Sequence, residues 1–267
     1  MWQRMFKVAA PHVLVVLVLA VGCGARTPAA SPHMGSAPST IPEAVSKAVD
    51  ASDRSAADRA LDAGRRPAET FAFFGVEPGD RVAELAAGGG YSAELLARIV
   101  GPSGMVYGVN SPFLLNRFAQ EPWAARLRKP VMQNVIRVDR DFDDPLPPEA
   151  TGLDAVLCIL FYHDFFWQDV DRASMNRAVF TSLKQGGVYG IVDHAARNGA
   201  GTDDVKSLHR IERDVVVDEI EAAGFRLVAE GQFLRNALDP MDWNAAPSAA
   251  GSRRGTSDRF VLKFIKP

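Results

Sequence analysis

The sequence has 267 residues, a length that fits one large α/β domain or two small ones. Its composition is 47% hydrophobic and 23% charged with a formal net charge of −2, so it lacks the basic excess that nucleic-acid binding requires. The two cysteines, Cys23 and Cys158, provide neither a disulfide framework nor a cysteine-based metal site.

Residues 1–22 are predicted to be a lipoprotein signal peptide. Arg4 and Lys7 form a positive segment, and the apolar run that follows is short for a spanning helix, which needs ~20 residues. Residues 19–23, Leu-Ala-Val-Gly-Cys, then resemble the lipobox of bacterial lipoproteins, in which the cysteine is lipidated. We therefore expect the protein to be held at a membrane of the cell envelope through lipidated Cys23. An uncleaved anchor or an ordinary signal peptide is the other interpretation of this leader.

Residues 23–43 are rich in Ala, Ser, Pro, Gly and Thr. Such a segment buries too little apolar surface to fold, so it is predicted to be a flexible tether before a domain over residues 44–267. Met34 lies inside the tether, and translation that began there would give a cytoplasmic protein.

Residues 44–74 are predicted to be helical. Pro67 suits the first turn of a helix that runs to Phe74 and ends at Gly75. Arg65 and Arg66 precede this helix, and they either form a solvated face or reach a ligand carboxylate.

The next segment has the pattern of a strand, a glycine turn, a helix and a second strand. Residues 81–85 form a short apolar run, residues 87–90 read Ala-Gly-Gly-Gly, and apolar residues at helical spacing follow. Residues 105–109 are the second strand of this βαβ unit. A glycine turn at this place lets a ligand approach the backbone and the N-terminus of the helix.

Residues 84–90, Glu-Leu-Ala-Ala-Gly-Gly-Gly, resemble motif I of the class I S-adenosylmethionine-dependent methyltransferases, acid-x-G-x-G-x-G, with alanine at the first glycine position. Together with RRPAETFAFFGVEPGDRVAEL, the chain from about Asp53 to Pro267 resembles a group of bacterial predicted methyltransferases that are often exported. The resemblance implies S-adenosylmethionine as the cofactor. It implies that the methionine end is held by Glu84, Ala86, Gly88 and Gly90.

The same resemblance implies positions for the adenosine end. Asn110 ends the second strand, where the family carries an acid for the ribose hydroxyls. A third strand over residues 134–138 precedes Asp141, which matches the acid that accepts a hydrogen bond from adenine, with Asp139 as the alternative. Phe142 is expected to lie against the ring. Gly88, Gly90 and Asp141 are expected to line one pocket, so that Gly90→Val blocks the cofactor while the fold survives.

A fourth strand, residues 153–160, runs into Phe161-Tyr162-His163-Asp164, and a fifth over 188–192 ends before Asp193-His194. Ligands of open α/β sheets bind at the carboxyl ends of the strands, so these segments should face the site. The Asn/Asp-Pro-Pro-aromatic motif of amino-group methyltransferases is absent here, which argues against methylation of a base or of a glutamine amide.

Tyr162, His163, His194 and His209 are the candidate catalytic residues. His163 and His194 should be neighbours because they follow adjacent strands, and His209 joins them if residues 195–208 fold back over the sheet. A histidine can act as a general base that removes a proton from the methyl acceptor. Three histidines with a carboxylate can equally bind a metal, but we assign no metal ligand.

The sequence therefore predicts a doubly wound α/β domain with a seven-stranded mixed sheet in the order 3-2-1-4-5-7-6, as the resemblance implies. Residues 225–234 and 259–265 are its last strands, an antiparallel hairpin, and the loop over 236–257 is expected to be a lid or disordered. The predicted function is methyl transfer from S-adenosylmethionine to a small-molecule or other non-nucleic-acid acceptor. The alternative is an exported binding protein or metal-dependent enzyme on the same fold that no longer transfers methyl groups.

Overall fold

The computed structural model describes residues 1–2, 33–35 and 40–267, and one compact unit extends from Pro32 to Pro267. Most of the predicted leader, including Cys23, lies outside the described residues. Within the described ranges, no helix has both the length and the apolar character needed to cross a membrane.

A single mixed sheet forms the centre of this unit, with the strand order β1-β7-β8-β6-β5-β2-β3-β4. The strands are β1 (His33–Gly35), β2 (Arg81–Leu85), β3 (Met105–Asn110), β4 (Val135–Asp139), β5 (Leu153–Ile159), β6 (Leu183–His194), β7 (Arg226–Gly231) and β8 (Arg259–Ile265). Strands β4, β3, β2, β5 and β6 are parallel, and β8 is antiparallel to both β6 and β7. The predicted seven-stranded sheet and its strand order are confirmed. The short β1, which comes from the segment predicted as a tether, adds an eighth, parallel strand beside β7.

The two central strands, β2 and β5, are largely buried, as their place in the sheet requires. In β2 every residue after Arg81 is buried, and β5 is buried along most of its length. Helices cover both faces of a parallel sheet, so its strands read as nearly continuous apolar runs. Glu84 is the exception in β2, because it is a carboxyl group only 3% exposed.

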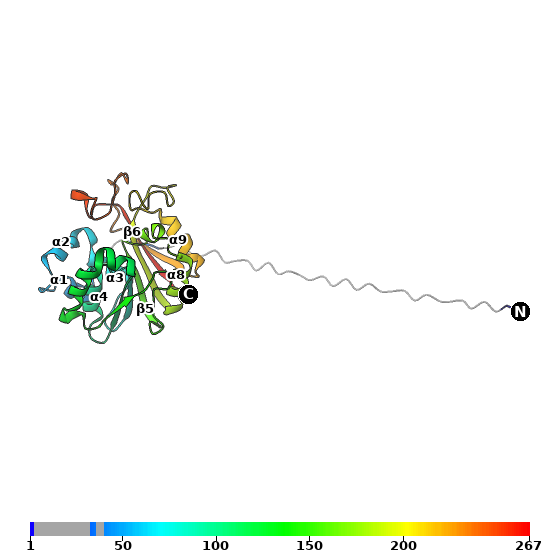
Figure 1. Ribbon diagram of the computed structural model, residues 1–267, viewed down its shortest axis with the longest axis horizontal. Helices are drawn as coiled ribbons and strands as arrows, with labels where there is room; N and C mark the ends of the chain where they lie inside the picture. Colours follow the sequence, from blue (N-terminus) through cyan, green and yellow to red (C-terminus); the bar gives the residue numbers. More distant parts are fainter. Residues whose placement is uncertain (3–32, 36–39) are drawn as a thin grey trace. The chain divides into compact units, whose positions relative to one another are not determined.

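Helices lie on both sides of this sheet. They are α1 (Glu43–Asp50), α2 (Ala56–Arg65), α3 (Pro67–Phe74), α4 (Tyr91–Val100), α5 (Pro112–Leu114), α6 (Gln120–Leu127), α7 (Asp164–Trp167), α8 (Arg172–Ser182) and α9 (Arg213–Ala222), with the π-helix η1 (Leu115–Ala119) and the 3-10 helices η2 (Pro130–Met132) and η3 (Gly251–Arg253). Figure 1 shows α1 and α4 to one side of β5 and β6, and α8 and α9 to the other. The predicted limits of α3 are confirmed, since Pro67 is its first residue and Gly75 ends it with a left-handed φ of 75°.

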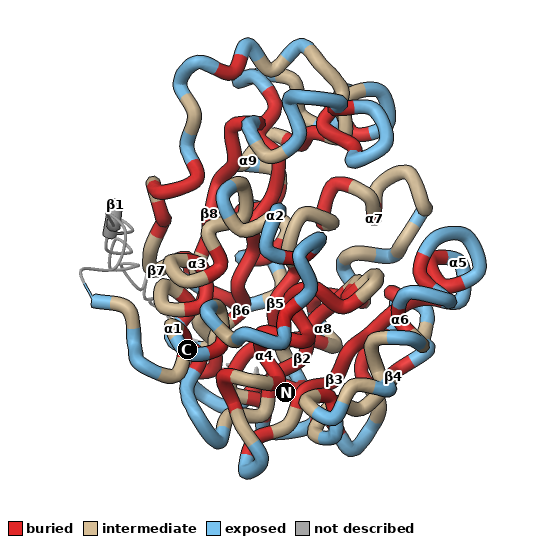
Figure 2. Tube along the Cα trace, turned by 90° about the vertical axis from the view of Figure 1, so that its left-hand side faces the viewer, coloured by how far each residue is buried: buried red, intermediate tan, exposed pale blue. Residues whose placement is uncertain are grey.

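The sheet is the buried part of the molecule, and the connecting loops are its exposed part (Figure 2). Two long connections, residues 195–212 and 232–258, belong to the same end of the sheet as His194. The amide of Ile211 donates to the carbonyl of His194 at 3.0 Å, and the amide of Ala196 donates to the carbonyl of Ile211 at 2.9 Å. The segment after β6 therefore folds back, as predicted, and brings residue 209 to the strand ends.

The loop over residues 236–257 is ordered, and a buried ion pair anchors it. Arg210 is fully buried, and its Nη1 donates to Asp239 Oδ2 at 2.8 Å. The indole of Trp243 donates to Asp239 Oδ1 at 2.7 Å. A buried pair with no sequence signature therefore anchors this loop to the segment after β6, and that the loop serves as a lid stays a prediction.

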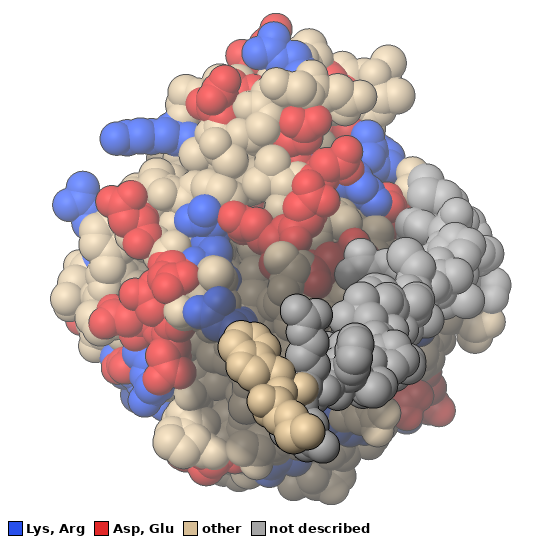
Figure 3. Space-filling view, turned by 90° about the vertical axis from the view of Figure 1, so that its right-hand side faces the viewer, with Lys and Arg blue, Asp and Glu red and all other residues tan. Residues whose placement is uncertain are grey.

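Charged side chains are mixed on the face drawn in Figure 3. Asp and Glu side chains lie between Lys and Arg side chains there, and no basic patch dominates this face.

Candidate active site

The glycine turn joins β2 to α4 and has one open point. Ala86 and Gly88 both adopt a φ of 56°, and Gly90 adopts 81°. A Cβ atom added to Gly88 would meet nothing nearer than the carbonyl oxygen of Ala86 at 3.9 Å. The backbone at Gly88 is therefore open to a ligand, as a phosphate- or carboxylate-binding turn before a helix requires.

Gly90 faces protein. A Cβ atom there would lie 2.4 Å from Trp123 Cζ3 and 2.7 Å from Arg126 Cδ. Gly108 in β3 meets the same indole, with 2.6 Å to Trp123 Cζ2. The missing side chain of Gly90 therefore makes room for helix α6 to pack on the turn. That Gly90 lines the cofactor pocket stays a prediction.

The side chain of Asn110 hydrogen-bonds to the glycine turn. Its Oδ1 accepts a hydrogen bond from the Gly88 amide at 2.7 Å, and its Nδ2 donates to the Gly88 carbonyl at 3.2 Å. The side chain is fully buried. The residue predicted to bind the ribose hydroxyls therefore braces the turn instead.

Two ionisable side chains near the turn, an acid and a guanidinium, make no hydrogen bond to each other. Glu84 Oε2 is buried and has no hydrogen-bond partner among the described residues, and burial raises the pKa of this carboxyl to about 8. The guanidinium of Arg65 stacks on the Tyr91 ring at 4.3 Å, and among the described residues it has no hydrogen-bond or ion-pair partner. Burial lowers the pKa of Arg65. An unpaired buried acid is costly, whereas the half-buried guanidinium keeps contact with water, so a ligand that pairs with both groups would chiefly relieve Glu84.

Asp141 lies in a separate cavity of about 350 Å³ at the ends of β3 and β4. The cavity is also lined by Ser111, Phe113, Phe142 and Trp167. Asp141 is exposed, so its carboxylate is available to a ligand. Phe142 is buried, and its ring centroid lies 4.9 Å from that of Phe165, so it forms part of an aromatic wall.

A larger cavity, about 580 Å³, lies between α1, α4 and η2. Pro78 and Gly101, which line it, precede β2 and β3. It is therefore near the amino ends of the strands, away from the edge where ligands of this fold class bind.

The histidines meet at the carboxyl ends of β5 and β6. The ring centroid of His163 lies 5.8 Å from that of His194 and 5.2 Å from that of His209. The predicted convergence of the three rings is thus confirmed. That one of them takes a proton from an acceptor stays a prediction.

Carboxylates hold His163 from both sides. Its Nδ1 lies 2.7 Å from Asp193 Oδ1, and its Nε2 lies 3.1 Å from Asp164 Oδ1. Burial alone lowers the pKa of His163, but the charges and hydrogen bonds of Asp193 and Asp164 outweigh it and raise the pKa to about 10. Sequence reasoning named both acids as neighbours of the histidines, but it did not include them among the site residues.

His194 has a different environment. Its Nδ1 lies 2.7 Å from the hydroxyl of Ser257, and burial together with the neighbouring His163 lowers its pKa well below the ordinary value. It is a neutral ring beside a charged one.

Tyr162 points away from the cluster. Its hydroxyl donates to Glu219 Oε2 and accepts from Asn176 Nδ2, both at 2.9 Å, and the residue is fully buried. The prediction that Tyr162 is catalytic is therefore wrong, because its hydroxyl ties α8 to α9.

No family model and no curated protein sequence matches this chain. Among solved structures, an S-adenosylmethionine-dependent methyltransferase from Aquifex aeolicus is 17% identical with a TM-score of 0.54, over 83% of this chain and 98% of that one. The cyclase SpnF is 18% identical with a TM-score of 0.53, over 82% of this chain and 85% of that one. The mitomycin 7-O-methyltransferase MmcR is 13% identical with a TM-score of 0.52, over 78% of this chain and 54% of that one. At these identities the likeness shows a common architecture, so the chain has the fold of the class I S-adenosylmethionine-dependent methyltransferases.

Proposed function

We propose that the protein is an S-adenosylmethionine-dependent methyltransferase that acts on a small-molecule or other non-nucleic-acid acceptor. The observation that carries the proposal is the set of incomplete groups around the open glycine turn. The Gly88 backbone is accessible, Glu84 has an unpaired buried oxygen, and Arg65 has an unpaired guanidinium.

These groups fit the methionine end of the cofactor. That end carries an ammonium and a carboxylate, which need an acid and a cation respectively. Glu84 supplies the acid, and Arg65 supplies a planar guanidinium whose position is fixed by stacking on Tyr91. The ring of Tyr91 is itself held, because its hydroxyl donates to Asp62 at 2.6 Å.

The adenosine end fits in part. The exposed carboxylate of Asp141 can accept a hydrogen bond from an exocyclic amino group, and the aromatic wall that includes Phe142 borders the same cavity. The ribose position does not fit the family pattern, since Asn110 is occupied by Gly88. We expect the ribose to contribute less to affinity here than the amino-acid end.

The chemistry asks the protein mainly for alignment. Bound S-adenosylmethionine supplies a methyl group on a sulfonium, from which a neutral thioether leaves readily. The residues of the site need only to orient the methyl group toward the acceptor and to exclude water. Because β2 pairs with β5, the glycine turn and the histidine cluster share one edge of the sheet, and an acceptor has its place between them.

The test is calorimetric titration of the purified full chain with S-adenosylmethionine. Arg65→Ala should weaken binding by roughly 10- to 100-fold, the usual effect of losing a charge-assisted hydrogen bond. The matched control is Arg128→Ala, which removes an exposed arginine without touching the turn. Absence of heat with the wild type, or equal affinity for both variants, would refute the proposal.

The compartment is a separate proposal. We infer from the lipobox resemblance that Cys23 is lipidated and holds the domain at a membrane. Metabolic labelling with a fatty acid should mark the wild type and leave Cys23→Ser unlabelled. Equal labelling of both proteins, or of neither, would count against the lipoprotein.

A further inference from the structure

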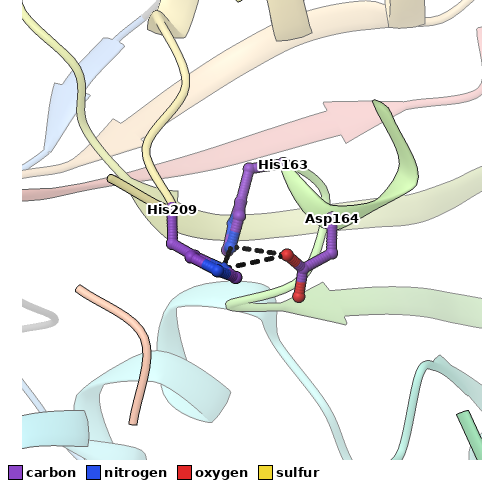
Figure 4. A group of neighbouring side chains, drawn as sticks. All are labelled: His163, Asp164 and His209. Atoms are coloured by element: carbon purple, nitrogen blue, oxygen red, sulfur yellow. Dashed lines mark hydrogen bonds and ion pairs between the residues drawn. The ribbon is translucent and has the colours of Figure 1, made fainter. Parts of the chain in front are cut away.

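The side chains of His163, Asp164 and His209 converge on one point at the ends of β5 and β6 (Figure 4). His163 Nε2 lies 3.2 Å from His209 Nδ1, and each of these nitrogens lies 3.1 Å from Asp164 Oδ1. Three potential ligand atoms therefore form a nearly equilateral triangle. We propose that this triangle binds a divalent first-row transition-metal ion through two imidazoles and one carboxylate.

The spacing suits such an ion. Ligand bonds of about 2.1 Å place an ion about 1 Å out of the plane of the three atoms, with angles of about 95° between its bonds. That is the arrangement of two histidines and one carboxylate on a single face of a metal, which leaves the opposite positions open. A site with three protein ligands and open positions is of the kind that also takes water or a substrate oxygen.

The surroundings of His163 orient it as a metal ligand. Metal-bound histidines usually donate their second ring nitrogen to a carboxylate or a carbonyl, which fixes the ring and its tautomer. Asp193 supplies this carboxylate, with its Oδ1 2.7 Å from His163 Nδ1 and its Oδ2 accepting from the His163 amide at 2.8 Å. Metal binding releases the Nε2 proton of the charged ring, while Nδ1 keeps its proton and donates it to Asp193, and the lone pair of Nε2 is then directed at the centre of the triangle.

His209 is held in place against its backbone preference. It adopts a φ of 51°, a left-handed conformation that costs a non-glycine residue about 1–2 kcal/mol. Its neighbours fix it there, because the Leu208 carbonyl accepts from the Ala245 amide at 2.9 Å and the Arg210 guanidinium donates to the Ala195 carbonyl at 3.0 Å. Strain that the surroundings maintain is common at functional sites. Here it directs an imidazole at Asp164.

The site is accessible. The side chain of His209 is 23% exposed and that of Asp164 is 15% exposed, whereas His163 behind them is 3% exposed. An ion can therefore enter past the first two ligands. The rival arrangement is an ion-pair cluster in which both rings donate N–H to Asp164 Oδ1, alongside the Trp167 indole at 2.6 Å. A direct metal titration separates the two.

The experiment uses the purified full chain, stripped of metal with a chelator, and Co²⁺ as the probe. We expect visible absorption that saturates at one Co²⁺ per chain and is displaced by Zn²⁺. His209→Gly should weaken Co²⁺ binding by at least about 100-fold, more than the loss of an outer-shell partner. Glycine accepts the left-handed φ, so this variant should fold at least as stably as the metal-free wild type.

The matched control is His194→Asn, which removes the neighbouring imidazole but no ligand atom and should keep the Co²⁺ affinity of the wild type. No absorption with the wild type, or unchanged binding by His209→Gly, overturns the proposal. So does equal loss by His194→Asn and His209→Gly. No cofactor is present in this titration, so its outcome is independent of methyl transfer, and the metal site can stand or fall without the proposed function.

Discussion

The side-chain amide of Asn110 brackets the peptide of Gly88, accepting from its N–H at 2.7 Å and donating to its carbonyl at 3.2 Å. The end of β3 is thereby tied to the turn after β2. A carboxylate could make only the first of these two hydrogen bonds, because it has no donor. The amide therefore fixes the one part of the turn that is open to a ligand.

Asn110→Asp should destabilise the protein by about 1–3 kcal/mol, because the Gly88 carbonyl loses its donor and a buried charge faces it. The measurement is the free energy of unfolding in urea. A matched Asn134→Asp variant also loses a donor to backbone carbonyls, at a site away from the turn. If only Asn110→Asp changes cofactor affinity, the bracket matters for binding. An Asn110→Asp protein as stable as the wild type would contradict this account.

Ala86 stands at the first glycine position of the motif and keeps the glycine conformation, with a φ of 56°. Ala86→Gly should therefore stabilise the protein by about 1 kcal/mol, since a left-handed backbone is strained for alanine. Ala87→Gly is the control. Its φ is not left-handed, so the same change should destabilise by roughly 0.5–1 kcal/mol through greater freedom of the unfolded chain. Urea unfolding of the two variants should give opposite signs.

The glycines of the turn should differ in what they tolerate. Gly90→Ala places a Cβ atom 2.4 Å from the Trp123 ring, so we expect a loss of several kcal/mol or failure to fold. Gly88→Ala meets no atom nearer than 3.9 Å and should lose only the ~1–2 kcal/mol of left-handed strain while weakening cofactor binding. Thermal unfolding and calorimetry on both variants check this. A folded, stable Gly90→Ala protein would show that Trp123 can move aside.

Much of the fold could be predicted because its signals are local. The apolar runs of β2 and β5, the glycine turn and the proline and glycine limits of α3 each follow from a few adjacent residues. Adjacent strand ends also sufficed to place His163 beside His194. The strand order came from the family resemblance.

What the sequence could not show depends on distant residues. The space beside the Cα atom of Gly90 is filled by the ring of Trp123 from helix α6, and nothing in the local motif indicates that contact. Tyr162 follows Leu160, whose φ of 59° breaks the alternation of strand side chains. A left-handed residue there redirects the side chains that follow it. The alternation of side chains along β5 therefore could not be extended to predict which way Tyr162 points. The sequence likewise could not show that the Arg65 guanidinium lacks an acidic partner among the described residues, because that depends on which side chains surround it in the folded protein.

The last prediction concerns pH and the buried carboxyl of Glu84, whose pKa burial raises from 4.5 to about 8. Between these values the folded state binds a proton that the unfolded state has released. Stability therefore falls as pH rises through this window and levels off above it. Glu84→Gln removes the titration, so the stability of the wild type relative to this variant should decline from about pH 5 to about pH 8. Urea unfolding across this range measures the difference, and Glu121→Gln, at an exposed position, controls for the loss of one carboxyl. Parallel curves for the wild type and Glu84→Gln would mean that Glu84 is ionised in the folded protein. Saturating S-adenosylmethionine should shift the window to lower pH if its ammonium pairs with Glu84, because a cation favours the carboxylate.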